Sequence, residues 1–106
     1  MTINEYQELA IRTLGEGSNT EHLINGVMGL CGESGECIDI VKKHTFQGHE
    51  LDREHLLEEI GDVAWYLAVI AHSLNASLDD ALVANIEKLK KRYPNGFEAE
   101  RSINRV

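Results

Sequence analysis

The chain has 106 residues, of which 42% are apolar and 26% charged, as expected for one globular domain with a modest core. Its net charge of −8 argues against nucleic-acid binding, which needs a basic surface. No apolar run approaches the roughly 20 residues of a membrane span, and the N-terminus lacks a signal-peptide pattern. We therefore expect a cytoplasmic protein that binds no membrane, with a single domain over residues 1–106 and reduced cysteines at Cys31 and Cys37.

The first two predicted helices each begin with a capping box, in which a hydroxyl side chain and a glutamate three residues later cap each other. Thr2 and Glu5 have this spacing at the start of the chain, and Ser18 and Glu21 repeat it. The second helix should run from about residue 19 to about residue 44. The four glycines Gly26, Gly29, Gly32 and Gly35 lie along it at a spacing of three. Each weakens a helix by about 1 kcal/mol relative to alanine, so they predict close approach of a neighbouring helix or a ligand.

Asp52 and Ser77 are the predicted N-caps of a third and a fourth helix, and Pro94 ends the fourth. The third helix has the clearest helical period in the chain, with apolar residues at Leu56, Ile60, Val63, Leu67, Ile70 and Leu74. Helices this long and apolar favour a bundle or an obligate oligomer. The predicted fold is therefore all-α, an antiparallel bundle of about four helices that is completed by oligomerisation.

Two acidic pairs are the candidate functional residues. Glu33 and Glu36 lie three residues apart in the second helix, and Glu59 and Asp62 have the same spacing in the third. That spacing places each pair on one helix face, and both pairs are flanked by apolar residues, where carboxylates need a partner or a cation. Oxygen ligands of this kind suit hard cations such as Mg²⁺. A solvated helix face is the alternative interpretation of each pair taken alone.

A polar stripe and a basic stripe complete the predicted site. Tyr66 follows Asp62 by one turn, and Asn85, Lys88 and Arg92 share one face of the fourth helix. Lysine and arginine near a metal site suit phosphate oxygens. Together with the acids they predict a phosphate-hydrolysing site, in which bound metal activates a water and the cations stabilise the developing charge. Trp65, Phe46 and His44 are three candidates for stacking on a base.

Three segments of the sequence carry a resemblance to a known family, namely GESGE, EEIGDVAWYL and NIEKLKKRYPNGF. In them, the sequence resembles the MazG-type nucleotide pyrophosphohydrolases of the all-α NTP-pyrophosphatase superfamily. The resemblance covers most of the chain, from Val27 to Phe97. It implies Mg²⁺ or Mn²⁺ as cofactor, bound by the catalytic acids Glu33, Glu36, Glu59 and Asp62. It also implies that Tyr66, Asn85, Lys88 and Arg92 bind the nucleotide. Many members carry a further glutamate where Gly32 stands, which bears on the number of metal ions bound.

The same resemblance implies hydrolysis of a nucleoside triphosphate, NTP or dNTP, to the monophosphate and pyrophosphate. It further implies homodimers or homotetramers whose sites need more than one subunit. Two other functions stay open at this point. The chain could be a helical dimerisation or regulatory module without catalysis, or a hydrolase of a related phosphoribosyl nucleotide.

Overall fold

A computed structural model describes residues 1–105 as an assembly of helices, so the predicted all-α fold is confirmed. The helices are α1 (Ile3–Ile11), α2 (Asn19–Phe46), α3 (Arg53–Ser73), α4 (Leu78–Arg92) and α5 (Ala99–Ile103). In this part of the chain, β-structure is limited to one isolated bridge between Pro94 and Gly96. The short helix α5 was not predicted.

Each of the helices α1 to α4 begins at a side chain that caps it. Both predicted capping boxes form, with Thr2 accepting from the Glu5 amide and Ser18 from the Glu21 amide. Asp52 accepts from the amide of His55 at 3.1 Å, and Ser77 from the amide of Asp80 at 3.0 Å. Each cap satisfies a backbone donor that the first helical turn leaves free. The starts of α1 to α4 therefore follow directly from the sequence.

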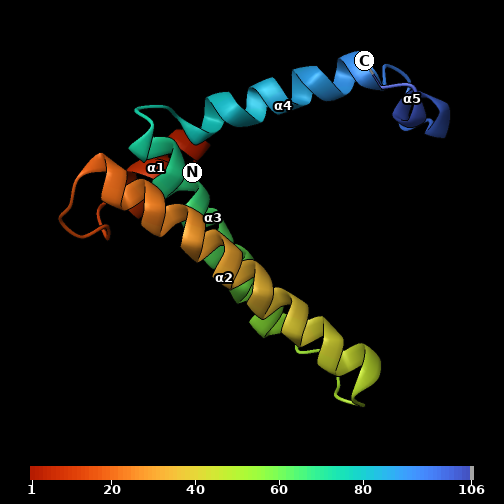
Figure 1. Cartoon of the computed structure of the whole chain (residues 1–106), viewed down its shortest axis with the longest axis horizontal. Coiled ribbons are helices and arrows are strands. Elements are labelled where there is room, and N and C mark those ends of the chain that lie inside the picture. The colour runs from red at the N-terminus through yellow and green to blue at the C-terminus, as the bar shows by residue number, and fades with distance from the viewer. Residues whose placement is uncertain (106) are drawn as a thin grey trace.

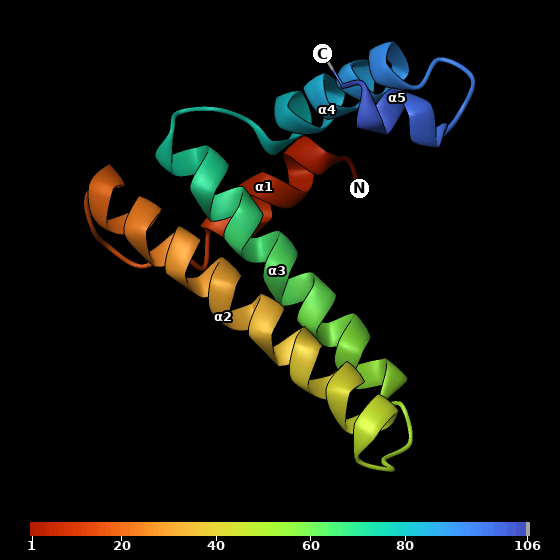
Figure 2. The same ribbon diagram turned by 45° about the vertical axis from the view of Figure 1, so that its right-hand side comes forward.

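The helices α2 and α3 form a long antiparallel hairpin, and α1 lies across α3 (Figures 1 and 2). The indole nitrogen of Trp65 fastens α1 to α3 by donating to Thr13 Oγ1 at 2.8 Å and to the Ala10 carbonyl at 3.2 Å. Trp65 therefore has a structural role as the anchor of α1.

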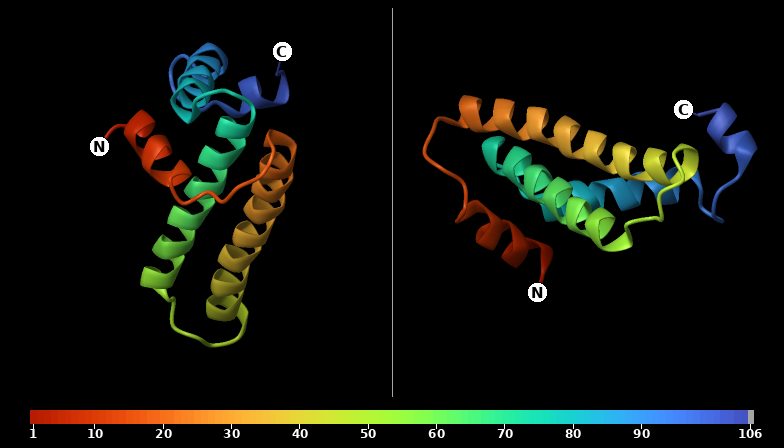
Figure 3. Two further views of the ribbon diagram at one scale, coloured as in Figure 1. Left: turned by 90° about the vertical axis from the view of Figure 1, so that its left-hand side faces the viewer. Right: turned by 90° about the horizontal axis from the view of Figure 1, so that it is seen from below.

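The fourth helix leaves this hairpin, so that α3 and α4 are bent by 101° relative to each other. At the bend, Asn75 has φ 55°, a left-handed conformation that asparagine tolerates better than most residues. The Gln7 amide of α1 holds the turn by donating to the Ala76 carbonyl at 3.1 Å and accepting from the Leu78 amide at 2.7 Å. As a result α4 projects away from the hairpin and carries α5 at its far end (Figure 1). Both helices lie at the end of α3 opposite the loop between α2 and α3 (Figure 3, left).

Few side chains are buried within one chain. The core consists mainly of small residues, namely Ala10, Ile40, Ala68, Val69 and Ala71. By contrast, Ile60 and Leu74 of the predicted apolar seam of α3 are exposed. The accessible surface is 7881 Å², whereas a compact monomer of this mass has about 5,900 Å². The radius of gyration is 16.9 Å, compared with about 13 Å for a compact domain of this length. The chain is thus much more open than a self-contained bundle.

No individual helix among the described residues is both long enough and apolar enough to cross a membrane. By length and composition alone, the bent pair of α3 and α4 meets that test when the two are taken together.

Candidate functional site: an acidic cluster between α2 and α3

Three of the four predicted acids meet where α2 and α3 pack together. Glu33 of α2 and Glu59 and Asp62 of α3 each offer a carboxylate oxygen, and these three oxygens lie within 4.8 Å of one another. The antiparallel hairpin produces this meeting because it places the middle of α2 beside the first half of α3. Glu36, the fourth acid, is exposed one turn further along α2, and its charge still acts on Glu33. Glu33 of the first pair therefore meets both acids of the second pair, whereas Glu36 lies outside the cluster.

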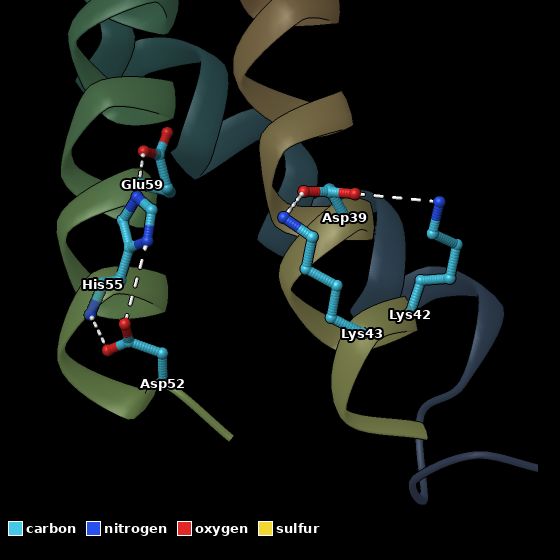
Figure 4. Close-up of polar contacts among 6 residues, drawn as sticks. All are labelled: Asp39, Lys42, Lys43, Asp52, His55 and Glu59. Atoms are coloured by element: carbon cyan, nitrogen blue, oxygen red, sulfur yellow. Dashed lines mark hydrogen bonds and ion pairs between the residues drawn. The ribbon is translucent and has the colours of Figure 1, made fainter. Parts of the chain in front are cut away.

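Glu59 is the most constrained of these acids. It is only 8% exposed, although the other two members of the cluster are half-buried or exposed. Its Oε1 lies 3.1 Å from Nε2 of His55, one turn earlier on α3 (Figure 4). Its Oε2 is buried and has no hydrogen-bond partner among the described residues. A buried carboxylate oxygen without a partner is costly, so this atom indicates that a cation belongs beside it.

The electrostatics of the cluster point in the same direction. A hydrogen bond with Glu59 raises the pKa of Glu33 to about 7, helped by desolvation and by the charges of Glu59, Asp62 and Glu36. Two ionised carboxylates have no proton to share, so this hydrogen bond forms only when Glu33 is protonated. When both acids are ionised, Glu59 Oε2 has no partner among the described residues. Without a cation, the cluster therefore holds a proton near neutral pH. A divalent cation would replace that proton and relieve the repulsion.

The donor set fits Mg²⁺ or Mn²⁺. All the clustered ligand atoms are carboxylate oxygens, which hard divalent cations prefer over nitrogen or sulfur. Neither cysteine belongs to the cluster, and both are free thiols. The acids would hold one face of such an ion and leave its other positions to water or phosphate oxygens.

Tyr66 lies beside the cluster and packs against α2. A Cβ placed on Gly29 would lie 2.0 Å from Cε1 of Tyr66, so only glycine leaves room for this ring. Gly26 similarly admits Ile70, where a Cβ would lie 2.8 Å from Cγ1. Close helix approach thus accounts for these two glycines, whereas Gly32 and Gly35 have open space beside them. A contact between Tyr66 and the nucleotide stays a prediction.

The basic stripe lies elsewhere within the same chain. At 1.5 Å of rise per residue, Lys88 lies about 15 Å from the start of α4. The end of α3, from which α4 departs, lies about 16 Å from Asp62 by the same measure. Because the two helices are bent by 101°, one chain does not bring Asn85, Lys88 or Arg92 to its own acids. Lys88 and Arg92 instead line a cleft of about 630 Å³ between α4 and the C-terminal segment.

Some residues at the acidic cluster and at the cleft on α4 were not predicted from the sequence. Burial and the charge of Asp62 raise the pKa of Tyr6, which places this α1 side chain near the acidic cluster. The cleft on α4 is also lined by Lys91, Arg101 and Arg105. Five of its eight lining residues are thus basic, in a chain with only ten lysines and arginines. The density of arginines after Pro94 was the available signal for this cleft.

Comparison with known proteins gives one family. The model of the MazG nucleotide pyrophosphohydrolase domain matches residues 21–97, which include both acidic pairs and the basic stripe. The chain is 35% identical over 86 residues to the Gene 37 protein of Mycobacterium phage L5, covering 77% of this chain and 75% of that one. It is 42% identical over 41 residues to the uncharacterized protein YvdC of Bacillus subtilis (strain 168), covering 39% of each. No solved structure matches.

Proposed function

The chain belongs to the MazG nucleotide pyrophosphohydrolase domain family, and from this premise we propose that it hydrolyses a nucleoside triphosphate to the monophosphate and pyrophosphate. The substrate class is NTP or dNTP, the cofactor is Mg²⁺ or Mn²⁺, and residues 1–106 act as one catalytic domain in the cytoplasm. The observation that carries the proposal is the buried Glu59 Oε2, which has no partner among the described residues and belongs to a cluster with the Glu33 and Asp62 carboxylates.

The four acids form the proposed metal site. Glu33, Glu59 and Asp62 hold the cation, and the exposed Glu36 completes the set from the next turn of α2. When bound, Mg²⁺ would neutralise phosphate charge and lower the pKa of a water molecule. In the hydrolysis, a water molecule would form a bond to the α-phosphorus while the bond from this phosphorus to the bridging oxygen breaks, and pyrophosphate would leave. A carboxylate of the cluster takes the water's proton as general base.

The cations of α4 come from a second copy of the chain in this proposal. Lys88 and Arg92 would neutralise the phosphates and Asn85 would orient the nucleotide, together with Tyr66. The chain exposes about 2,000 Å² more than a compact monomer would, which is comparable to the area buried by an obligate interface. The α4 arm exposes four large apolar residues, Leu82, Val83, Ile86 and Leu89. The α2–α3 hairpin offers a matching surface at Ile24, Val27, Met28, Ile38, Val41, Leu57 and Ile60. We therefore propose a homodimer or homotetramer with shared sites.

The test is a panel of NTPs and dNTPs incubated with Mg²⁺, with the products identified. We expect monophosphate and pyrophosphate from at least one nucleotide. Glu59→Gln should abolish the reaction while leaving the helical content unchanged. Release of orthophosphate, or full activity of Glu59→Gln, would contradict the proposal.

Two other functions are distinguished by the same assay. A helical dimerisation module would turn over no nucleotide, and Mg²⁺ would not raise its melting temperature. A hydrolase of phosphoribosyl-linked nucleotides would act only when the panel includes that class. The buried acid favours the pyrophosphohydrolase over the module, because an interaction surface gains nothing from an unpartnered carboxylate.

A further inference from the structure

Three polar residues form a continuous line along the first two turns of α3 (Figure 4). Asp52 Oδ1 accepts a hydrogen bond from the His55 amide at 3.1 Å, and Asp52 Oδ2 lies 4.0 Å from Nδ1 of the His55 ring. The other ring nitrogen, Nε2, lies 3.1 Å from Glu59 Oε1. The imidazole thus stands between the helix cap and the buried carboxylate, with one nitrogen facing each.

The two oxygens of Glu59 have different surroundings as a consequence. Oε1 is bound to His55, whereas Oε2 is buried without a partner among the described residues, in the cluster with Glu33 and Asp62. A carboxylate held at one oxygen can no longer turn freely about its terminal bond, so its second oxygen is held in place as well. His55 itself is exposed, with 44% of its side-chain surface accessible, so burial in a core does not account for its position.

We propose that His55 is a positioning residue, whose Nε2–H donates to Glu59 Oε1 and fixes Oε2 for a divalent cation. Asp52 caps the helical turn that carries the ring, by accepting from the His55 amide. This inference rests on the proposed function, because it assumes that the cluster binds a metal ion. Hydrogen bonds to ligating carboxylates orient them, and removing such a partner weakens metal binding about 10- to 100-fold. A plain surface pair would instead contribute a little stability and nothing to metal affinity.

The experiment measures Mn²⁺ binding directly, from the electron paramagnetic resonance signal of free Mn²⁺ in titrations of the full chain without nucleotide. His55→Leu removes the donor and should raise the Mn²⁺ dissociation constant about 10-fold. His55→Gln keeps an amide N–H that can reach the residue four positions on, and it should restore most of the affinity. The matched control is His44→Leu, because the His44 ring bonds the His49 carbonyl at 2.9 Å and belongs to no acidic cluster.

Equal affinity of His55→Leu and wild type would overturn the inference, as would an equal loss in His44→Leu or no recovery in His55→Gln. If His55→Leu lost helical content, His55→Asn, which retains an amide but is too short to reach Glu59, would replace it with the same expected loss. Failure of the proposed function would give different experimental outcomes from failure of the His55 inference. If wild type and the variants bind Mn²⁺ with the expected order of affinities but wild type hydrolyses no nucleotide, the role of His55 is supported and the proposed enzymatic activity is contradicted. Wild-type protein that binds no Mn²⁺ overturns both.

Discussion

The Glu33 carboxylate of α2 and the Glu59 carboxylate of α3 lie within 4.8 Å of each other, although the two residues belong to different helices. Within the part of the chain that the structure describes, no lysine or arginine pairs with either acid. The Asp62 carboxylate belongs to the same cluster, and the His55 ring hydrogen-bonds to the pair on its Glu59 side. The raised pKa of Glu33 is the direct consequence, and it makes the stability of the metal-free protein depend on pH.

Glu33 should make the metal-free protein less stable as pH rises from about 4.5 to about 7. The folded state keeps the Glu33 proton up to about pH 7, whereas the unfolded chain loses it near its ordinary value of 4.5. The folded state therefore binds more protons in this window, so the free energy of unfolding falls with pH. Urea denaturation between pH 5 and pH 8 measures it. Glu33→Gln should remove this part of the slope, and identical slopes in both proteins would refute the assignment.

The same linkage predicts that metal binding strengthens as pH rises toward 7, because the cation competes with the Glu33 proton. Isothermal titration with Mg²⁺ in buffers of different ionisation enthalpy measures the proton released. We expect release on binding at pH 6 and much less at pH 8. Release that is equal at both values would be inconsistent with Glu33 as the coupled group.

Gly29→Ala should destabilise the protein by about 1–3 kcal/mol, because the added methyl overlaps the Tyr66 ring. Gly32→Ala is the matched control on the same helix. It has open space beside it, and it should stabilise by up to about 1 kcal/mol through helix propensity. Thermal melts of both variants give the comparison. Were both substitutions to stabilise α2, the close packing of Tyr66 on Gly29 would be wrong.

The shared site predicts rescue between two inactive proteins. Glu59→Gln lacks a metal ligand and Arg92→Gln lacks a phosphate ligand, so each should lose nearly all activity alone. A mixed oligomer contains one site with intact acids from one copy and intact Arg92 from the other. For randomly paired dimers, mixing should restore about a quarter of the wild-type rate. The control mixes Glu59→Gln with Glu33→Gln, which share the same defect and should stay inactive. No rescue in the first mixture would place the whole site in one chain.

The cleft between α4 and α5 predicts a contribution of the C-terminal segment to phosphate binding. Arg101→Gln should weaken triphosphate binding about 10-fold, since a hydrogen bond to a charged group contributes roughly 1.5 kcal/mol. Lys90→Gln is the control, because Lys90 pairs with Glu87 at 3.7 Å and does not line the cleft. Equilibrium binding of a triphosphate without metal measures both variants. Equal affinities would assign the cleft no part in binding.

Local signals in the sequence predicted much of the fold and the acidic half of the site. Thr2, Ser18, Asp52 and Ser77 cap their helices because a capping interaction spans only three residues and needs no tertiary contact. The pairing of Glu33 with Glu59 also followed, since a short loop between two long helices makes them antiparallel neighbours.

Other features depend on contacts that sequence periodicity does not contain. The direction of α4 is set by the turn at Asn75 and by Gln7, a residue about 70 positions away from its partners Ala76 and Leu78. The approach of Tyr6 to Asp62 likewise requires knowing that Trp65 anchors α1 on α3. The exposed seam residue Ile60 shows why periodicity predicts an apolar face but not what covers it.

In the proposed reaction, the acidic cluster directs water to the α-phosphorus of a nucleoside triphosphate. The most direct test runs the Mg²⁺-dependent reaction in water enriched in ¹⁸O and locates the label by mass spectrometry. Attack at the α-phosphorus predicts one ¹⁸O in the monophosphate and none in the pyrophosphate. Label found in pyrophosphate or in orthophosphate would contradict the account.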